Sequence, residues 1–533
     1  SISSYFLIVF QHNQKSARDN ALQALLVTGL GGMALMAGLI LMAQIGDTWL
    51  ISELTLLGNE ITGHPHYTAI LILVLLGAFT KSAQFPFHFW LPNAMSAPTP
   101  VSAYLHSATM VKAGIFLMFL MYPILGGTAL WTVILATTGS ITLLLGGVYG
   151  LCQYDLKRIL AGTTLAVLGL LTVLLGIGSE KDILAGLIFL IGHALYKATL
   201  FMVAGNIDHA TGTRDVRRLA GLRRAMPLTM AAAGLAALSK AGFPPFVGFL
   251  GKEYVYKTGL ALDSLDGLLV GAVFVTNAIL MALAFKVGFH PFWHRPEPGE
   301  ASEVVDPDAA HEVSARMWAG PVLLAAGGLV LGLLPGLFTG PLLSVASASV
   351  AGYAYPVKFV LWQGFNLPLL ISGLTLLAGI SIYRFRHFIW RNPSGGRFLR
   401  GLDTEWIYDG LYRLFVFVCA RQTRFIQNGS LRRYLMVIIG VTSVLLFFRL
   451  INLDGWPDLF LAQKTQKPHL TYENLRTNPP TFSREIITHD PPPDYPLAHN
   501  VPVAFGDYDG DGRVDVVVNH TDGTLVTLYR NTT

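Results

Sequence analysis

The chain has 533 residues, of which 53% are hydrophobic and 13% are charged, and its mean hydropathy is +0.52. Its charge content is about half that of soluble proteins, which excludes a water-soluble enzyme or binding module and indicates a polytopic membrane protein. The net charge of +5 reflects basic loops on one side of a membrane rather than nucleic-acid binding.

Apolar segments of about 20 residues, enough to cross the hydrocarbon core, follow one another along most of the chain. Residues 1–10 read as the tail of another helix. Because the chain starts with Ser and has no signal peptide, we expect it to begin inside a longer protein. The predicted spans are 22–46, 68–90, 101–123, 130–152, 158–178, 182–206, 226–250, 266–288, 319–340, 365–384 and 432–451. They predict an all-α polytopic membrane protein with about 11 transmembrane helices plus a partial one.

Lysine and arginine residues gather in the loops that follow alternate helices. These loops include Arg214, Arg217, Arg218, Arg223 and Arg224, and the segment 384–433 adds ten arginines. Loops rich in Lys and Arg stay in the cytoplasm. We therefore predict a multi-pass protein of the cell membrane with these loops inside and the tail after about residue 452 outside.

The first interrupted helix contains a lysine. In the run 77–86 (GAFTKSAQFP), Lys81 lies halfway along the predicted helix 68–90, and Pro86 breaks that helix. A buried ammonium is expensive in a membrane, and carbonyls freed by a proline can help to hold a proton or a cation. Lys81 could instead snorkel to an interface, but its central position favours a role in transport.

His106 and Lys112 lie six residues apart in the predicted helix 101–123, among small and apolar residues. Both are candidate proton sites, because ionisable groups inside a membrane usually serve transport. The histidine could instead simply hydrogen-bond a neighbouring helix.

His193 and Lys197 form a stronger pair. Their i, i+4 spacing places both side chains on one face of the predicted helix 182–206, near its centre. An imidazole next to a buried ammonium gives two groups that can exchange protons near neutral pH. The spacing therefore predicts a proton relay.

Lys240, Lys252 and Glu253 flank a second interrupted segment, 241–250 (AGFPPFVGFL). They are candidate ion-translocation residues, although Lys252 could be a plain interfacial anchor. Charged residues at similar depth on successive helices predict a horizontal chain of proton sites. The two breaks are separated by an odd number of helices, which predicts an inverted repeat with the substrate path between its halves.

Four stretches carry a family resemblance. The stretch 79–114 (FTKSAQFPFHFWLPNAMSAPTPVSAYLHSATMVKAG) resembles the signature of the antiporter-like subunits shared by respiratory complex I and the Mrp cation/proton antiporters, and is most similar to the large A-type Mrp subunits. The stretches 193–198 (HALYKA), 242–253 (GFPPFVGFLGKE) and 422–434 (QTRFIQNGSLRRY) match the same family. The resemblance covers about residues 1–450.

The resemblance implies roles for residues in the first half. Lys81 matches a central lysine that pairs with a glutamate on the preceding helix, and His106 matches a relay histidine. That glutamate lies in a family stretch like FWELTSISS, so we expect it a few residues before Ser1.

The resemblance also implies roles for residues in the second half. His193 and Lys197 match the relay there, and Lys252 matches the lysine at the far end of the path. An uncharged residue is expected where Lys240 stands, so this chain departs from the family pattern at that position.

The end of the chain has a different composition. Residues 464–500 are polar and rich in proline, which is typical of a linker. In the following run 507–515 (DYDGDGRVD), alternate carboxylates could wrap one Ca²⁺ with oxygen ligands. The candidate ligands are Asp507, Asp509, Asp511 and Asp515.

The acidic run does not fit an EF-hand, because Val518 stands where that loop needs an acid. Its spacing resembles the FG-GAP loops of β-propeller blades, and the stretches 516–518 and 524–529 read as a hairpin. One blade cannot close a propeller, so a solvated acidic turn or a fusion scar is the alternative.

We divide the chain accordingly into five parts. They are the first part of the antiporter-like membrane domain at 1–206, the remainder of its second repeat at 207–340, additional helices with the arginine-rich segment at 341–451, a linker at 452–500, and the calcium-loop hairpin at 501–533.

The resemblance implies secondary active transport, in which Na⁺ is exchanged for H⁺ by the large subunit of a complex with other Mrp-type subunits. A proton-pumping subunit of complex I or of a membrane hydrogenase is the first alternative, and a non-transporting membrane fragment or anchor is the second. Nothing in the sequence resembles a flavin, iron–sulfur or quinone site. We therefore expect a transporter subunit rather than an enzyme, with Ca²⁺ in the tail as the one candidate cofactor.

Overall fold

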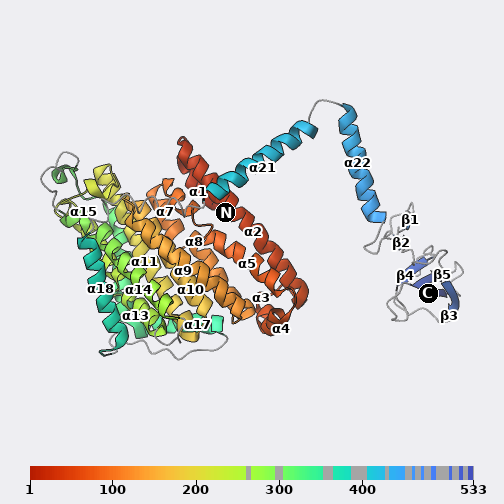
Figure 1. Cartoon of the computed structure of the whole chain (residues 1–533), viewed down its shortest axis with the longest axis horizontal. Coiled ribbons are helices and arrows are strands. Elements are labelled where there is room, and N and C mark those ends of the chain that lie inside the picture. The colour runs from red at the N-terminus through yellow and green to blue at the C-terminus, as the bar shows by residue number, and fades with distance from the viewer. Residues whose placement is uncertain are drawn as a thin grey trace. The chain divides into compact units, whose positions relative to one another are not determined.

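The computed structural model describes residues 1–259, 266–294, 304–351, 364–385, 405–426 and 431–450, and six short strands between 459 and 531. The chain divides into two compact units, Ser1–Asp409 and Gly410–Thr533. In the first unit, most of the long helices run side by side (Figure 1).

Helices account for nearly all of the described secondary structure before residue 451. The first half contains α1 (Ile2–Ile8), η1 (Val9–Gln11), α2 (Lys15–Gly46), α3 (Ile51–Leu54), η2 (Thr55–Leu57), α4 (Gly58–Gly63), α5 (Tyr67–Lys81), α6 (Trp90–Asn93), η3 (Ala94–Ser96), α7 (Thr99–Ser107), α8 (Met110–Leu125), α9 (Ala129–Leu151), α10 (Leu156–Ile177) and α11 (Glu180–Thr211). The second half contains η4 (Val216–Arg218), α12 (Pro227–Ala241), α13 (Val247–Gly259), α14 (Asp266–Gly288), α15 (His290–Trp293), η5 (Pro307–Ala309), α16 (Ala315–Leu333), η6 (Pro335–Thr339), α17 (Gly340–Ala351), α18 (Leu367–Arg384), α21 (Glu405–Ile426) and α22 (Leu431–Leu450).

The predicted all-α membrane fold is confirmed. Within the described residues, 8 helical segments are long and apolar enough to cross a membrane. One predicted span is wrong in detail: the segment 101–123 is not a single helix, because α7 ends at Ser107 and α8 begins at Met110. His106 and Lys112 therefore belong to different helices.

Both predicted helix breaks are present. Helix α5 ends at Lys81 itself, so this lysine lies at the end of a helix and not at its middle as the sequence suggested. Helix α12 ends at Ala241, and Gly242 then takes a φ of +75°, which favours glycine because it has no Cβ. Pro86 and Pro244 follow and cannot donate a backbone hydrogen bond, so neither helix can continue.

At each break, a later side chain caps a carbonyl that the helix leaves without its usual partner. The Trp90 indole donates to the Thr80 carbonyl at 2.9 Å, and the Lys252 ammonium donates to the Ala241 carbonyl at 3.3 Å. Buried carbonyls need such partners. The two side chains thus hold the residues that follow each break against the ends of α5 and α12.

Helix α10 lies at the centre of the first unit and is buried along almost its whole length. It packs against α9 through glycines: a Cβ on Gly169 would lie 2.6 Å from the Gly139 carbonyl oxygen, and one on Gly162 would lie 2.9 Å from that of Gly146. Small residues let membrane helices approach closely, where dispersion and packing replace the hydrophobic drive. We call this contact, formed by Gly139 and Gly146 on α9 and by Gly162 and Gly169 on α10, the glycine seam. It holds α10 in place, and α10 in turn supports the buried side chains described below.

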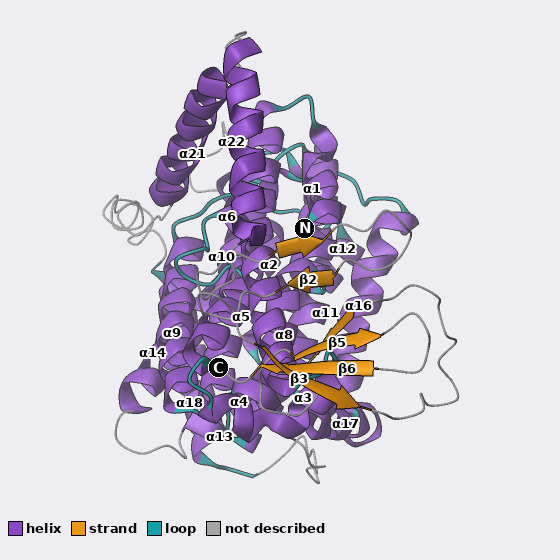
Figure 2. Ribbon diagram, turned by 90° about the vertical axis from the view of Figure 1, so that its right-hand side faces the viewer, coloured by secondary structure: helices purple, strands orange, loops and turns teal. Residues whose placement is uncertain are grey.

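The second unit contains strands as well as helix. Strands β1 (Leu459–Leu461) and β2 (Leu470–Tyr472) pair with each other, and β3 (Phe482–Ile487), β4 (Val503–Gly506), β5 (Asp515–Asn519) and β6 (Val526–Asn531) form an antiparallel sheet in the order β3-β6-β5-β4. Figure 2 shows this sheet with β6 beside β5. The candidate calcium ligands Asp507, Asp509 and Asp511 lie outside the described residues, and Asp515 opens β5 opposite Gly506.

Candidate functional site

Buried basic side chains form a row through the helices of the first unit. His106 on α7, Lys112 on α8, and His193 and Lys197 on α11 are at most 5% exposed, and Lys252 on α13 is 6% exposed. Charged or titratable groups in a membrane interior usually mark an ion or proton path. This row is the candidate functional site.

Lys197 is the most completely coordinated member of the row. Its Nζ donates to the Leu160 carbonyl and to the Thr163 hydroxyl, both on α10, and lies 5.6 Å from the centre of the Phe201 ring. The glycine seam holds α10 in place, so these two oxygens form a fixed acceptor pair. The pair stabilises the charged ammonium that burial would otherwise disfavour.

His106 lies close to this ammonium. Its ring centre is 6.0 Å from that of Phe201, and its imidazole interacts electrostatically with both Lys197 and Lys157. Among the described residues, neither of its ring nitrogens has a hydrogen-bond partner. The imidazole is therefore available to accept or pass a proton on either side.

His193 lies near three lysines, whereas His106 lies near two. Its imidazole interacts electrostatically with Lys112, Lys197 and Lys240, and within the described part of the chain neither ring nitrogen is hydrogen-bonded. The Lys112 ammonium donates to the Leu190 carbonyl of α11 at 3.4 Å. The structure thus brings together both histidines and three lysines that the sequence singled out.

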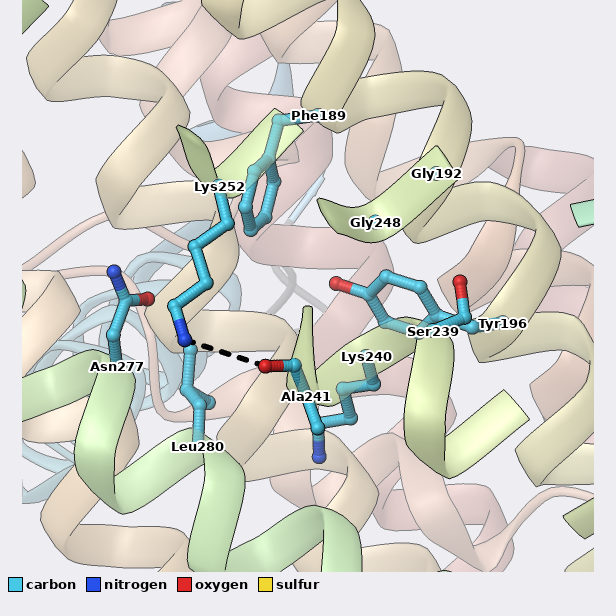
Figure 3. Close-up of a pocket in the computed structure, with 10 residues that line it drawn as sticks. All are labelled: Phe189, Gly192, Tyr196, Ser239, Lys240, Ala241, Gly248, Lys252, Asn277 and Leu280. Carbon is cyan, nitrogen blue, oxygen red and sulfur yellow. Dashed lines mark hydrogen bonds between the residues drawn. The ribbon is translucent and has the colours of Figure 1, made fainter. Parts of the chain in front are cut away.

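Lys240 and Lys252 line one narrow pocket at the second helix break. Figure 3 shows Lys252 reaching to the Ala241 carbonyl, with Tyr196 and Ser239 on the other side. The complete lining is Phe189, Gly192, Tyr196, Ser239, Lys240, Ala241, Gly248, Lys252, Asn277 and Leu280. The pocket therefore continues the row from α11 toward α12, α13 and α14.

Glu253 is a buried carboxylate next to Lys252 in sequence, and it is 3% exposed. Its Oε1 accepts a hydrogen bond from the Asn366 amide at 3.2 Å. The Asn366 side chain also accepts from the Leu369 backbone and so begins α18. Glu253 is thereby tied to α18 rather than to the lysines of the pocket.

Lys81 lies apart from this row at the first break. Its Nζ donates to the Ser1 hydroxyl at 2.8 Å, which joins the end of α5 to the start of the chain. Lys81 is half-buried, in contrast to the fully buried Lys197.

Sequence reasoning missed two buried lysines. Lys157 is 1% exposed and donates to the Ala97 carbonyl, and Lys286 is 2% exposed and donates to the Gln153 carbonyl at 2.6 Å. Lys157 looked like an ordinary cytoplasmic loop charge because Arg158 follows it. The available signal was Asp155, whose side chain caps the start of α10 by accepting from the Lys157 backbone, so that Lys157 belongs to a helix and not to a loop.

The loop between α11 and α12 holds exposed ion pairs outside the membrane helices. Arg214 contacts Asp155 at 3.1 Å, and Arg217 pairs with Asp215. Burial alone would raise the pKa of the Asp215 carboxyl, but the hydrogen bonds and charge of Arg217 outweigh it and lower that pKa. These contacts fasten the loop to the start of α10.

The buried basic groups of the row act on one another through their charges. Each buried charge disfavours a second charge on its neighbour, so a proton that arrives at one group shifts the protonation of the next. The described residues contain no group of three or more His, Cys, Asp or Glu side chains placed to hold a metal ion.

Comparison with known families gives two matches. Residues 1–280 match the model of the family described as NADH:quinone oxidoreductase/Mrp antiporter, transmembrane, and residues 451–518 match that of the FG-GAP-like repeat. The first match agrees with the resemblance seen in the sequence. The second agrees in kind, but it also covers the predicted linker 452–500 and ends within the segment 501–533 that was predicted as the calcium-loop hairpin.

Individual relatives are similar over most of this chain. A protein of Rhizobium meliloti, named as the A/B component of a probable K(+)/H(+) antiporter, is 43% identical over 77% of this chain and 41% of its own length. The A component of the Na(+)/H(+) antiporter of Alkalihalophilus pseudofirmus is 34% identical over 86% of this chain and 59% of its own length. The chain thus spans about half the length of the curated relatives it matches.

Solved structures share the fold. The Mrp complex from Dietzia sp. DQ12-45-1b matches with a TM-score of 0.71 and 31% identity, over 87% of this chain and 50% of that one. An archaeal membrane-bound sulfane sulfur reductase matches with a TM-score of 0.66 over 83% and 78%, but its 20% identity supports only the fold.

Proposed function

The chain belongs to the NADH:quinone oxidoreductase/Mrp antiporter transmembrane family, and on that premise we propose that it carries protons as one component of a cation/proton antiporter. The exchanged cation is a monovalent alkali ion, and we propose Na⁺, which stands in the names of relatives from Staphylococcus haemolyticus and Alkalihalophilus pseudofirmus. The chain works in a multi-subunit membrane complex with other Mrp-type subunits, as part of a transporter and not as an enzyme.

The observation that supports this function best is the row of buried basic groups. His106, His193 and Lys197 are 0% exposed, and each histidine interacts electrostatically with Lys197. Lys112 and Lys240 interact in turn with both His193 and Lys197. A pure scaffold has no need to bury so many ionisable groups, since each costs free energy in the membrane.

In the proposed mechanism, protons cross the first unit laterally along this row. Lys81, which lies apart from the row, exchanges with one side at the first helix break, and Lys252 exchanges with the other side at the second. His106, Lys197 and His193 pass the proton between them. Each arriving charge repels the next one, so uptake at one end favours release at the other.

The remaining candidates support this path. Lys112 and Lys240 flank His193 and set the local positive field, while Glu253 fixes the helix of Lys252 against α18. The orientation follows the basic loops: those around Arg214 and Arg217 face the cytoplasm.

The exchange is tested in everted membrane vesicles that contain the native complex. A respiration-generated ΔpH is recorded with a fluorescent amine, and NaCl, KCl or choline chloride is then added. We expect Na⁺ to dissipate the ΔpH and choline to leave it intact. If K⁺ dissipates the ΔpH and Na⁺ does not, the transported cation is K⁺, as in the name of the Rhizobium meliloti relative, and the proposal of cation/proton exchange still holds.

The control is a vesicle preparation from cells in which this chain is deleted. If those vesicles dissipate the ΔpH as fast as the wild type, the antiport proposal is wrong. A ΔpH that only a redox substrate can build or release through this chain would instead favour a respiratory proton pump.

A further inference from the structure

Lys157 is a buried lysine that lies next to the row of basic groups. It is 1% exposed, and its ammonium donates to the Ala97 carbonyl just before α7 begins. On α10 it precedes Leu160 by three residues, and the Leu160 carbonyl accepts from the Lys197 ammonium. Less than one helical turn therefore separates Lys157 from an acceptor of the central ammonium of the row.

His106 interacts with Lys157 from inside the row. Its imidazole is 0% exposed and interacts electrostatically with both Lys157 and Lys197. The three groups come from α7, α10 and α11, which pack against one another. A proton that arrives at Lys157 therefore changes how readily His106 holds a charge.

Three partly exposed charged side chains also act on Lys157. Arg214 donates to the Asp155 carboxylate at 3.1 Å and lies 3.6 Å from the Asp208 carboxylate. The side chains of these three residues are between 31% and 36% exposed. All three interact electrostatically with Lys157. The cluster is thus accessible to water and at the same time acts on a fully buried ammonium.

Backbone contacts give this cluster a defined position. The Leu156 backbone donates to the Arg214 carbonyl at 3.0 Å. Asp155 caps the start of α10, and Asp208 lies in the last turn of α11. The loop that follows α11 is therefore paired with the start of α10, and its charges are held over the end of these two helices.

The charges of the cluster act on Lys157 with opposite signs. The Arg214 guanidinium disfavours a positive charge on Lys157, whereas the two carboxylates favour it. Because Arg214 contacts both carboxylates, it offsets part of their attraction. The titratable or charged groups that act on Lys157 among the described residues are His106 on α7, Asp155 at the start of α10, Asp208 on α11 and Arg214 in the following loop.

We propose that Asp155, Asp208 and Arg214 form an entrance through which the row exchanges protons with the cytoplasmic side, and that Lys157 connects this entrance with the row. Lys157 gives its proton to the neutral imidazole of His106, whose ring nitrogens have no hydrogen-bond partner among the described residues, and takes up another from water at the entrance. The reverse steps release a proton. Asp208 and Arg214 are positioning residues, because their charges set the pH at which Lys157 exchanges its proton.

This inference rests on the proposed transport of protons along the row and adds a connection from its middle to the cytoplasmic side. The test uses everted vesicles, whose medium contacts that side. The initial rate of cation-driven dissipation of ΔpH is measured over a series of medium pH values, with equal amounts of assembled complex. Protons that leave the vesicles in this assay pass through the entrance into the medium.

Two variants of one ion pair should shift the pH profile in opposite directions. Arg214→Gln removes a positive charge and stabilises the protonated Lys157, so the pH of half-maximal rate on the acidic side should rise by about half a pH unit. Asp208→Asn removes a negative charge and should lower that pH by about the same amount. Loss of a purely structural ion pair would instead affect both variants alike.

Two further variants separate a charge effect from misfolding. The double variant Asp208→Asn with Arg214→Gln removes one charge of each sign, so its profile should return to within about 0.2 pH unit of the wild type. Arg217→Gln removes an exposed charge from the same loop. Arg217 pairs with Asp215 and is not among the charges that act on Lys157, so this control should keep the wild-type profile.

Opposite shifts of the single variants, with a double variant close to the wild type, would support the entrance. Shifts in the same direction, or no shift in either variant, would overturn it while the wild type still exchanges. Loss of exchange in the double variant would also overturn it, because the ion pair would then serve folding. Absence of exchange in the wild type would contradict the proposed function itself, and with it this inference.

Discussion

At the scale of single residues, the account depends on how Lys197 keeps a charge inside the membrane. Its ammonium donates to the Leu160 carbonyl and to the Thr163 hydroxyl. The neighbouring Thr164 is equally buried, but its hydroxyl donates only to the Leu160 carbonyl. The two threonines therefore differ mainly in their contact with the lysine.

This difference gives a matched pair of variants. Thr163→Val removes an acceptor from a buried ammonium, which costs about 1.5–3 kcal/mol, and the rate of proton exchange in vesicles should fall by about tenfold or more. Thr164→Val should leave that rate within about twofold of the wild type. Equal effects of both substitutions would show that the Thr163 contact is not part of the path.

Outside the membrane helices, Asp215 provides a pH-dependent test. Arg217 lowers the pKa of this carboxyl, so the interaction stabilises the fold above the carboxyl's unfolded pKa, near 3.9, and is lost as the pH falls through the folded pKa. Asp215→Asn should therefore lower the unfolding midpoint at pH 7, and this effect should shrink as the pH falls below the unfolded pKa and vanish below the folded pKa.

The effect of Asp215→Asn should be small, because the Arg217 side chain is 58% exposed and such pairs contribute at most about 1 kcal/mol. A destabilisation that is equal at pH 7 and pH 3 would contradict the electrostatic origin.

Residue identity alone predicted much of the site but not all of it. The i, i+4 spacing of His193 and Lys197 placed both on a buried face, because helical periodicity is a local property. The contacts of Lys157 and Lys286 could not be predicted, since each donates to a carbonyl far away in the chain. The position of Lys81 at a helix end depends on where α5 stops, which hydrophobicity does not determine.

At the scale of elements, the glycine seam between α9 and α10 holds the acceptors of Lys197 in place. Glycines recur every seven residues at Gly162, Gly169 and Gly176 on α10, and two of them meet the glycines Gly146 and Gly139 on α9. The seven-residue spacing was visible in the sequence, but only the structure shows which helix it faces.

Two glycine-to-alanine substitutions should change the stability of the protein in opposite directions. A Cβ on Gly169 would lie 2.4 Å from the Leu143 backbone nitrogen, so Gly169→Ala should destabilise the protein by about 1–3 kcal/mol through overpacking. Gly32 on α2 has nothing within 4 Å of such a Cβ, and Gly32→Ala should stabilise by up to about 1 kcal/mol.

Thermal unfolding of the two variants checks this prediction. A Gly169→Ala midpoint at or above that of the wild type would mean that α9 can move away from α10 at little cost. The seam would then not be the rigid support assumed for Thr163.

At the scale of the whole molecule, the runs of apolar residues predicted eleven membrane spans, and eight of them coincide with helical segments of the described residues that are long and apolar enough to cross a membrane. The predicted spans 68–90, 226–250 and 432–451 do not, since the first two are interrupted and the third holds only a shorter apolar stretch among the described residues. The interruption between α7 and α8 was missed because no proline or glycine lies at Ala108 or Thr109. The proposed path crosses several helices laterally, and apart from the step between His193 and Lys197 it depends on contacts between distant parts of the chain.

The most direct test of that path is a proton-exchange assay on a single substitution. Lys197→Met removes the central ammonium of the row, and Lys181→Met removes an exposed ammonium from the same helix. In everted vesicles with equal amounts of assembled complex, we expect Lys197→Met to abolish cation-driven dissipation of ΔpH and Lys181→Met to retain it. Exchange by Lys197→Met at the wild-type rate would contradict the claim that protons pass through this row.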